Sequence, residues 1–390
     1  MENLWDYTES KTFEGDLNLR VYTSNLLGRS SDLVLHGGGN TSVKSKVDDE
    51  DILFVKGSGW DLISIEAEGF SPVGLDALIE MAKLEKLSDC DMVTSQKAAM
   101  INPTAPNPSV EAILHALIPF KFVDHTHADA IVTISNSKNG AKIIEELFPN
   151  FLIVPYVMPG FILAKKIYEM TQDFDWSMCD GIILHNHGIF TFDNDAKKSY
   201  DNMIKTVTKA EDYLDEFAFV EFKPLHVEKD FDMQRLQDIM SAEKGYDVSM
   251  HINQSDLAKF YASKKDLSSF SSRGVLTPEH IIRTKRVPLI LEEDDVLKAI
   301  EDFKQNYISY FQRYAKGEIC LNPAPNYAVI KNIGVVTFGK NEKEANILND
   351  IIEHTMLAVL RADKLGGYQS ISEKDSFDME YWELEQAKLK

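Results

Sequence analysis

Cysteine is scarce in this chain, and long apolar runs are missing. The three cysteines, Cys90, Cys179 and Cys320, are widely spaced and form no metal-type pair, which predicts free thiols in a reducing compartment. No apolar run reaches the roughly 20 residues that cross a bilayer. The acidic start at residues 1–6 lacks the hydrophobic segment of a secretory signal. We therefore expect a cytoplasmic protein without a membrane span.

Positive charge is also in short supply. The 390 residues include 41 Lys and Arg against 62 Asp and Glu, which gives a net charge of −21. Such an excess repels nucleic acids and anionic membranes, so we expect neither as a partner. If the substrate is itself an anion, local donors must attract it, which directs attention to glycine-rich turns and lysines.

What the chain does have is a 44% share of hydrophobic residues, enough for two domains or for one large domain with an extension. Strand and helix patterns alternate up to about residue 222, which predicts an α/β layered domain. Helix and strand signals return beyond residue 290, so we expect a folded C-terminal extension over 223–390. The elements expected include a helix at 14–28, a strand at 33–35, a helix at 75–87, and a helix that Asn107 caps and Pro108 begins.

Two His-x-His pairs are the main chemical signal. His125 and His127 fall in one apolar stretch that is typical of a strand, and His185 and His187 fall in another. Because residues i and i+2 share a face of a strand, each pair is expected to project its imidazoles in one direction. Such imidazoles with a nearby carboxylate suit a divalent metal, and zinc is the first expectation. Packed histidines or a purely structural zinc are the alternatives. The two stretches are 122–135 and 181–192.

Three segments are candidates for anion binding. Loops 37–42 and 56–59 are rich in small residues and could present backbone N–H groups to an anion. Neither matches the Walker pattern or the dinucleotide fingerprint, so ordinary tight turns are the alternative. The start of the 108–118 helix, with Ser109, is the third candidate.

Glu111 lies in the first turn of that expected helix, where an acidic residue is favourable with the helix dipole. Its functional interpretation is a carboxylate near the metal that binds the ion or moves a proton. His115, one turn further on, could join it as a ligand, although a packed histidine is the simpler interpretation.

A short segment recurs late in the chain. Residues 186–192 and 332–338 share four of seven residues, and each follows an apolar strand and precedes a long helix. In the later copy Lys331 and Ile333 replace His185 and His187. This is either a degenerate internal repeat that lost its metal ligands or two strand–helix units that converged.

Five segments in this order resemble those of the class II aldolase/adducin family. They are Gly-Gly-Asn-Thr-Ser (38–42), Lys-Gly-Ser-Gly-Trp-Asp (56–61), Pro-Ser-Val-Glu (108–111), His-Thr-His-Ala (125–128) and His-Asn-His-Gly (185–188). The resemblance to the aldolase module covers about residues 15–222. The later part, including 377–388, resembles the aldolase half of bifunctional rhamnulose-1-phosphate aldolase/short-chain dehydrogenase proteins. Since the chain stops where the dehydrogenase would follow, no nicotinamide chemistry is expected.

The resemblance implies a three-layer class II aldolase-like α/β fold, with a central, mostly antiparallel or mixed sheet flanked by helices, over residues 1–222. It also implies that Glu111 binds zinc in the resting site and serves as the catalytic acid/base. The residues implied as ligands of Zn²⁺ are His125, His127 and His187, with His185 behind them. The residues implied to hold the substrate phosphate are Gly39, Asn40, Ser58, Gly59 and Ser109. The chain departs from the family at Val110, where a second hydroxyl often precedes the glutamate. No motif maps the second proton donor, for which Tyr156 is a candidate.

Together these features predict a lyase of carbohydrate metabolism. The expected reaction is zinc-dependent retro-aldol cleavage of a ketose 1-phosphate, of the rhamnulose 1-phosphate type, to dihydroxyacetone phosphate and a small aldehyde. A small phosphorylated sugar is thus the expected ligand, and a homo-oligomer the expected assembly. A sugar-phosphate epimerase or dehydratase on the same scaffold is one alternative. A non-catalytic adducin-like interaction module is another, disfavoured because adducin-type domains lack the zinc histidines that this chain keeps.

Overall fold

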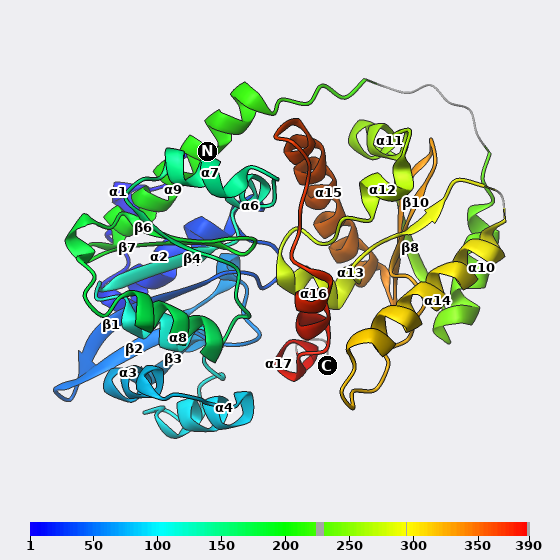
Figure 1. The fold of residues 1–390 in the computed structure, drawn as a ribbon. Coiled ribbons are helices and arrows are strands. Elements are labelled where there is room, and N and C mark those ends of the chain that lie inside the picture. Colours follow the sequence, from blue (N-terminus) through cyan, green and yellow to red (C-terminus); the bar gives the residue numbers. More distant parts are fainter. Residues whose placement is uncertain (224–229, 294, 388–390) are drawn as a thin grey trace. The chain divides into compact units, whose positions relative to one another are not determined.

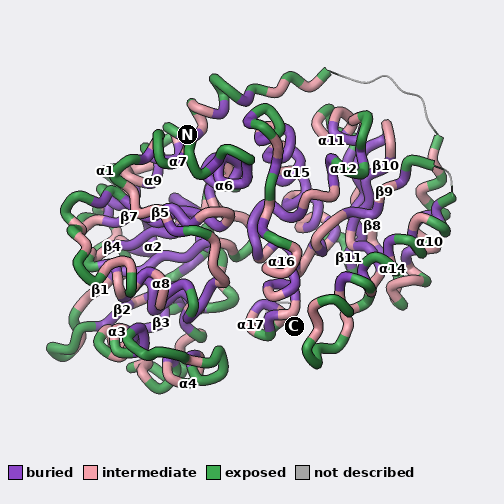
Figure 2. Tube along the Cα trace, viewed as in Figure 1, coloured by how far each residue is buried: buried purple, intermediate pink, exposed green. Residues whose placement is uncertain are grey.

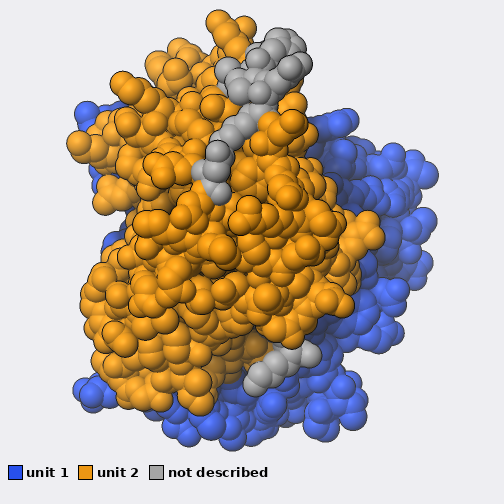
Figure 3. Space-filling view, turned by 90° about the vertical axis from the view of Figure 1, so that its right-hand side faces the viewer, with its two compact units in different colours: residues 1–135, 141–213 blue, residues 136–140, 214–390 orange. Residues whose placement is uncertain are grey.

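The computed structural model describes residues 1–223, 230–293 and 295–387, and the chain divides into two compact units (Figures 1 and 3). Unit 1 comprises Met1–Ser135 and Ala141–Tyr213, and unit 2 comprises Asn136–Gly140 and Leu214–Lys390. Within the described residues, no helix is both long and apolar enough to span a membrane. All three cysteines are free thiols, as the sequence predicts.

Unit 1 is built on a seven-stranded mixed sheet with the strand order β3-β2-β1-β4-β7-β6-β5. Every neighbouring pair is antiparallel except β5 and β6, which are parallel. In chain order the strands are β1 (Asn40–Val47), β2 (Glu50–Lys56), β3 (Phe70–Gly74), β4 (Phe122–Thr126), β5 (Phe151–Val154), β6 (Gly181–Leu184) and β7 (Gly188–Asp193). The mixed, mostly antiparallel sheet expected from the sequence is confirmed.

Helices cover both faces of this sheet, which makes three layers. The helices of unit 1 are α1 (Tyr7–Ser10), α2 (Asp16–Gly28), α3 (Leu75–Lys83), α4 (Asp89–Ala98), α5 (Ala112–Leu117), α6 (Asp129–Ser135), α7 (Gly140–Leu147), α8 (Phe161–Met170) and α9 (Ala196–Phe217). Asp124 on β4 bonds to Arg20 of α2 and Ser199 of α9, whereas the next residue, His125, faces Glu111 at the start of α5. Since successive side chains of a strand alternate, β4 presents Asp124 to one covered face and His125 to the other, and all five of its residues are buried (Figure 2).

Four expectations about local structure are wrong. The stretch 122–135 is not one strand, because β4 ends at Thr126 and the buried helix α6 follows; a short apolar run does not distinguish a strand from a buried helix. The stretch 181–192 is a hairpin that turns at Asn186, with φ 58°. Residues 33–35 lie in a turn rather than a strand, and α5 begins at Ala112 with Glu111, not Asn107, as its N-cap residue.

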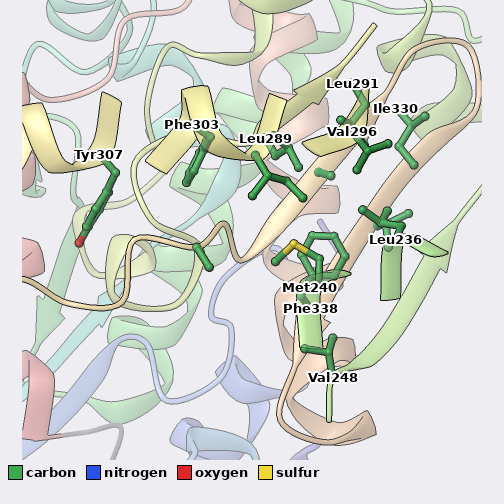
Figure 4. Close-up of a cluster of buried hydrophobic side chains, with 14 of the residues drawn as sticks. Leu236, Met240, Val248, Leu289, Leu291, Val296, Phe303, Tyr307, Ile330 and Phe338 are labelled. Atoms are coloured by element: carbon green, nitrogen blue, oxygen red, sulfur yellow. The ribbon is translucent and has the colours of Figure 1, made fainter. Parts of the chain in front are cut away.

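Unit 2 contains a four-stranded sheet with the order β8-β11-β10-β9. Its strands are β8 (Ser249–Asn253), β9 (Leu289–Leu291), β10 (Tyr327–Ile330) and β11 (Gly334–Gly339). Its helices are α10 (Met233–Lys244), α11 (Asp256–Ala262), α12 (Leu267–Ser271), α13 (Ile281–Thr284), α14 (Val296–Tyr314), α15 (Glu342–Lys364), α16 (Glu373–Glu380) and α17 (Glu383–Gln386). Leu236 and Met240 of α10, Phe303 of α14 and Phe338 of β11 share one apolar cluster (Figure 4).

The two sheets share one arrangement of strands. In unit 1, β6 lies between a parallel β5 and an antiparallel β7, and β4 pairs antiparallel with β7. In unit 2, β10 lies between a parallel β9 and an antiparallel β11, and β8 pairs antiparallel with β11. A seven-residue helix follows the last strand of this shared four-strand arrangement in each unit. It is α6 after β4 and α11 after β8.

Hydrogen bonds in the two hairpins correspond as well. The hydroxyl of Thr191 donates to a carbonyl of α9, and that of Thr337 donates to a carbonyl of α15. A Cβ on Gly188 would lie 2.4 Å from the carbonyl oxygen of Thr126, and one on Gly334 would lie 2.2 Å from that of Asn253. Both hairpins therefore need glycine, because each presses against the end of its neighbouring strand.

Candidate metal centre

Three histidines come together where β4 ends beside the β6–β7 hairpin. One ligand atom of each of His125, His127 and His187 lies within 4.8 Å of the others. Nε2 of His125 and Nε2 of His127 are 3.1 Å apart. The structure thus brings together the three histidines singled out from the sequence, although His127 lies just beyond the strand. His185, in the same hairpin, is not in this group.

Neighbouring groups fix the His125 ring. Its Nδ1–H donates to the carbonyl of Ile189 at 3.0 Å, because a carbonyl oxygen can only accept. The ring also stacks on Phe190, with centroids 4.1 Å apart. The proton on Nδ1 leaves the Nε2 lone pair directed at the other imidazoles, which is the state that binds a metal.

Glu111 provides a carboxylate within 4 Å of two of these imidazoles. Its Oε2 is 3.5 Å from His125 Nε2, and its Oε1 is 3.6 Å from His187 Nε2. The side chain is buried, and Oε1 has no hydrogen-bond partner among the described residues. A buried carboxylate oxygen without a donor is costly, and a cation between the imidazoles would satisfy it.

Electrostatics favour the charge states that a metal site requires. Burial lowers the pKa of His125 to about 3, so this imidazole is neutral at neutral pH. Burial by itself would raise the pKa of Glu111, but the interactions with His125 and His187 and the hydrogen bond from Asn40 outweigh it and hold that pKa below its usual range. A neutral imidazole and an ionised carboxylate are the forms that coordinate metals.

The donor set fits a divalent ion. Ligand atoms about 2.0–2.1 Å from a tetrahedral zinc lie roughly 3.3 Å apart, close to the 3.1 Å between the Nε2 atoms of His125 and His127. Three imidazoles alone would leave the fourth position of such an ion open, beside the Glu111 carboxylate. The geometry therefore suits an open, catalytic type of metal site.

A chain of buried hydrogen bonds supports Glu111 from behind. Asn40 Nδ2 donates to Glu111 Oε2 at 2.7 Å, and Asn40 Oδ1 bonds to Nε2 of His115. On the far side of the ring, Nδ1 of His115 lies 2.8 Å from the hydroxyl of Ser42. His115 is therefore neither a metal ligand nor merely packed, and the part played by Ser42 was not foreseen from the sequence.

The candidate anion loops adjoin one another. The amide of Ser58 donates to the carbonyl of Asn107 at 2.8 Å, and that of Ser109 donates to the carbonyl of Lys56 at 3.1 Å. Lys56 Nζ in turn donates to the carbonyl of Gly37 at 3.3 Å. The loops 37–40, 56–59 and 107–109 thus form one connected group. Because the amides of Ser58 and Ser109 are used internally, these two residues would offer an anion their hydroxyls.

Two of the predicted phosphate residues have further constraints. Gly39 has φ 64°, and a Cβ there would lie 2.7 Å from the carbonyl oxygen of His125, so only glycine lets this loop pass against β4. The side-chain amide of Asn40 is already held by Glu111 and His115. A phosphate role for Asn40 stays a prediction, and it would compete with these contacts.

An ion pair on the opposite face of β4 was missed from the sequence. Arg20 and Asp124 are both fully buried and bonded to each other, and Asp124 also accepts from Ser199. The available signal was an arginine on the apolar side of the 14–28 helix, opposite an aspartate next to His125. This pair fixes β4, which carries His125 and leads directly to His127.

Comparison with known proteins finds two family domains in this chain. The profile of the "Class II Aldolase and Adducin N-terminal domain" matches residues 19–214, and that of the "Aldolase class II, second domain" matches residues 227–389. The chain is 31% identical over 419 aligned positions to the "Uncharacterized oxidoreductase YuxG" of Bacillus subtilis (strain 168), an alignment that covers 100% of this chain. The chain spans only 60% of the length of that curated relative.

Solved structures are similar to part of the chain. The N-terminal class II aldolase domain of a conserved protein from Thermoplasma acidophilum is 41% identical, with a TM-score of 0.50, over 55% of this chain and 99% of that one. L-fuculose-1-phosphate aldolase from Thermus thermophilus is 15% identical, with a TM-score of 0.34, over 50% of this chain and 95% of that one.

The profile that covers half of the chain defines its class: the chain belongs to the class II aldolase/adducin family. The sheet flanked by helices is the class II aldolase-like fold that the sequence resemblance implied. The longer relative with an oxidoreductase name agrees with the resemblance to the aldolase half of bifunctional proteins.

Proposed function

We propose that this protein is a metal-dependent lyase that cleaves a ketose 1-phosphate by a retro-aldol reaction. The substrate would be of the rhamnulose 1-phosphate type, and the products would be dihydroxyacetone phosphate and a small aldehyde such as lactaldehyde. The observation that carries the proposal is the buried Glu111 carboxylate, 3.5 Å from His125 and 3.6 Å from His187, beside a three-histidine group.

His125, His127 and His187 would hold the ion, and Zn²⁺ is the ion we propose. When bound, such an ion supplies Lewis acidity at the point where negative charge develops during carbon–carbon cleavage. The burial of His125 and Glu111 excludes water from this point, which strengthens every electrostatic interaction there.

Glu111 would carry the proton. In cleavage, a second acid/base group would take the proton of the C4 hydroxyl as the C3–C4 bond breaks and the aldehyde leaves. The electron pair stays on C3 as an enediolate, to which Glu111 delivers a proton. One proton leaves oxygen and one arrives at carbon, so the reaction needs no oxidant or reductant. Tyr156 remains the candidate for the second proton donor.

The connected loops would hold the phosphate. Gly39, Asn40, Ser58, Gly59 and Ser109 are the residues proposed for this. Glycine allows close approach of the backbone, and the serine hydroxyls can donate to phosphate oxygens. A local group of donors also resolves the charge problem, since it can bind an anion despite a net charge of −21.

Aldehyde release from a small panel of ketose 1-phosphates tests the proposal. We expect cleavage of a deoxy-ketose 1-phosphate that a chelator abolishes and Zn²⁺ restores. Chromatography of the same mixtures detects an epimer or a dehydrated sugar. Such a product without free aldehyde would replace the proposed reaction by epimerisation or dehydration.

We further propose that residues 1–222 form the catalytic domain and that 223–390 form an extension containing a degenerate repeat of its histidine-bearing strands. The matching strand order and the glycines of the two hairpins support the repeat. In it Ile333 stands where His187 stands in the first copy, so the second copy would bind no metal.

A further inference from the structure

We propose that His115 and Asn40 are positioning residues that hold the Glu111 carboxylate in one orientation through a one-directional chain of hydrogen-bond donors. This inference rests on the proposed function, because it assigns the support of the group that would move the proton. Neither residue would touch the reacting carbon atoms.

The direction of the chain follows from donor chemistry. The carboxylate of Glu111 can only accept, so the group that lies 2.7 Å away must be the Asn40 amide nitrogen. Oδ1 of Asn40 then faces His115, and because this oxygen can only accept, Nε2 of the ring must carry a hydrogen. Nδ1 of a neutral ring must then accept, and the Ser42 hydroxyl, 2.8 Å away, is its donor.

The ring is held so that no other arrangement competes. His115 is fully buried and meets Phe190 edge to face, with centroids 5.3 Å apart. Its Nε2 faces the Asn40 side-chain oxygen and its Nδ1 faces the Ser42 hydroxyl, so both ring nitrogens have a partner. The ammonium of Lys44 donates to the carbonyls of His115, Ile118 and Phe120, at 2.9, 2.6 and 2.9 Å, and fixes the end of α5.

The consequence is a fixed asymmetry between the two carboxylate oxygens. Oε2 of Glu111 receives the Asn40 amide and lies 3.5 Å from His125, whereas Oε1 lies 3.6 Å from His187 and has no hydrogen-bond partner among the described residues. Without the donor at His115, the Asn40 amide could turn and present its oxygen to the carboxylate, which would repel it. The chain therefore fixes the orientation of the carboxylate, with Oε2 bonded to Asn40 and Oε1 left without a donor.

The first experiment needs no activity. In ¹⁵N-labelled, metal-free protein, long-range proton–nitrogen correlation spectra report which imidazole nitrogen carries the hydrogen, and the His115→Phe spectrum assigns the signals. We expect a His115 ring protonated at Nε2 only. A ring protonated at Nδ1, or at both nitrogens, would overturn the proposal whether or not the protein is an aldolase.

The second experiment measures proton transfer. Metal-loaded protein is incubated with dihydroxyacetone phosphate in D₂O, and loss of the C3 proton signal gives the exchange rate. His115→Phe keeps the packing on Phe190 but removes the donor, and we expect kcat and the exchange rate to fall roughly 10–100-fold, with little change in KM or in metal content. His115→Gln, whose amide can donate, should recover most of the rate.

Controls separate the possible failures. His251→Phe removes a similar histidine–asparagine bond in unit 2 and should leave the rate unchanged. Ser42→Ala removes only the first donor, with an expected fall of roughly threefold to tenfold, and serves if His115→Phe does not fold. A wild-type protein that neither exchanges nor cleaves contradicts the proposed function. A wild-type protein that does both, with unchanged variants, contradicts the role of His115.

Discussion

β4 and β8 hold the same place in the two units, and they differ in what they carry. β4 pairs with both β1 and β7, so both of its edges are covered, whereas β8 pairs only with β11. His125 pairs with Phe190 across β4 and β7, and Ile252 pairs with Val336 across β8 and β11. On the faces that correspond, unit 1 has a buried polar centre and unit 2 has an apolar core (Figure 4).

This difference shows that the strand arrangement alone does not make a site. The glycines of both hairpins and the threonine-to-helix bonds are present in both units. Unit 1 adds β1, which brings Asn40 and Ser42 next to β4 and thereby supports Glu111. The proposed metal chemistry would therefore depend on the additional strands as well as on the histidines.

The largest expected effect comes from the carboxylate. Glu111→Gln keeps the shape of the side chain but removes its proton-carrying capacity, so we expect turnover to fall by roughly 10²–10⁴-fold with most of the metal retained. Aldehyde release and metal analysis on the same sample check this. α5 precedes β4 in unit 1, and α10 precedes β8 in unit 2. When the C-terminal ends of these two helices are aligned, the exposed Asp238 of α10 takes the position of Glu111. An equal loss in Asp238→Asn would contradict the distinction between the two units.

The next effect is on stability. Arg20→Met leaves the fully buried Asp124 without its ion-pair partner, and breaking such a pair costs about 3–5 kcal/mol of unfolding free energy. In unit 1, Asp124 is paired with Thr191 across β4 and β7. In unit 2, His251 is paired in the same way with Thr337 across β8 and β11, and its ring bonds to Asn346 at 2.7 Å. His251→Ala should cost only about 0.5–1.5 kcal/mol. Denaturant unfolding compares the two, and similar losses would show that the polar face of β4 is not special.

Acid should destabilise metal-free protein through unit 1. His125 has its pKa lowered to about 3 from 6.5 by burial, so between these values the unfolded chain binds a proton that the folded chain does not. Stability must then fall as pH drops from 6.5 towards 3, by about 1.4 kcal/mol per pH unit for one proton. Glu111, with a lowered pKa, adds to this loss below about 4.5.

The counterpart of His125 in unit 2, Ile252, does not titrate. In His125→Asn, the unfolding free energy measured from pH 7 to pH 4 should therefore fall less steeply with decreasing pH. The difference in slope should correspond to about one proton. Replacing Ile252 by Val should leave the slope as it is. An unchanged slope in His125→Asn would mean that this imidazole is not held neutral by burial.

The smallest effect is expected from restoring one ligand in unit 2. Ile333→His places an imidazole where His187 stands in unit 1, but Ile252 supplies no second ligand beside it. We expect unchanged activity and metal content, with Ile333→Val as the control for packing. Additional bound metal would show that the second copy keeps more of a site than its residues indicate.

Sequence patterns predict the alternating elements, because apolar periodicity and turn residues are local signals, and the family resemblance implies the mixed sheet. They misplace the end of β4, because a buried helix such as α6 and a buried strand look alike in a short apolar run. They also place the start of α5 too early, at Pro108 instead of Ala112. His125, His127 and His187 are predicted as a group by the family resemblance, and the structure brings them together.

What could not be predicted depends on contacts between distant segments. The Asn40–His115–Ser42 chain joins β1 to α5, and the Arg20–Asp124 pair joins α2 to β4. Neither has a spacing that marks it in a sequence. Polar side chains that act through one another become visible only when the fold gives their distances.

Metal content per chain tests the central claim most directly. Wild-type protein loaded with Zn²⁺ and freed of excess ion should contain one zinc per chain, and His127→Ala should contain almost none. Gln254→Ala, which changes the residue just past β8 as His127 lies just past β4, should still contain one. Full zinc content in His127→Ala, or its loss in Gln254→Ala, would contradict a catalytic metal centre confined to unit 1.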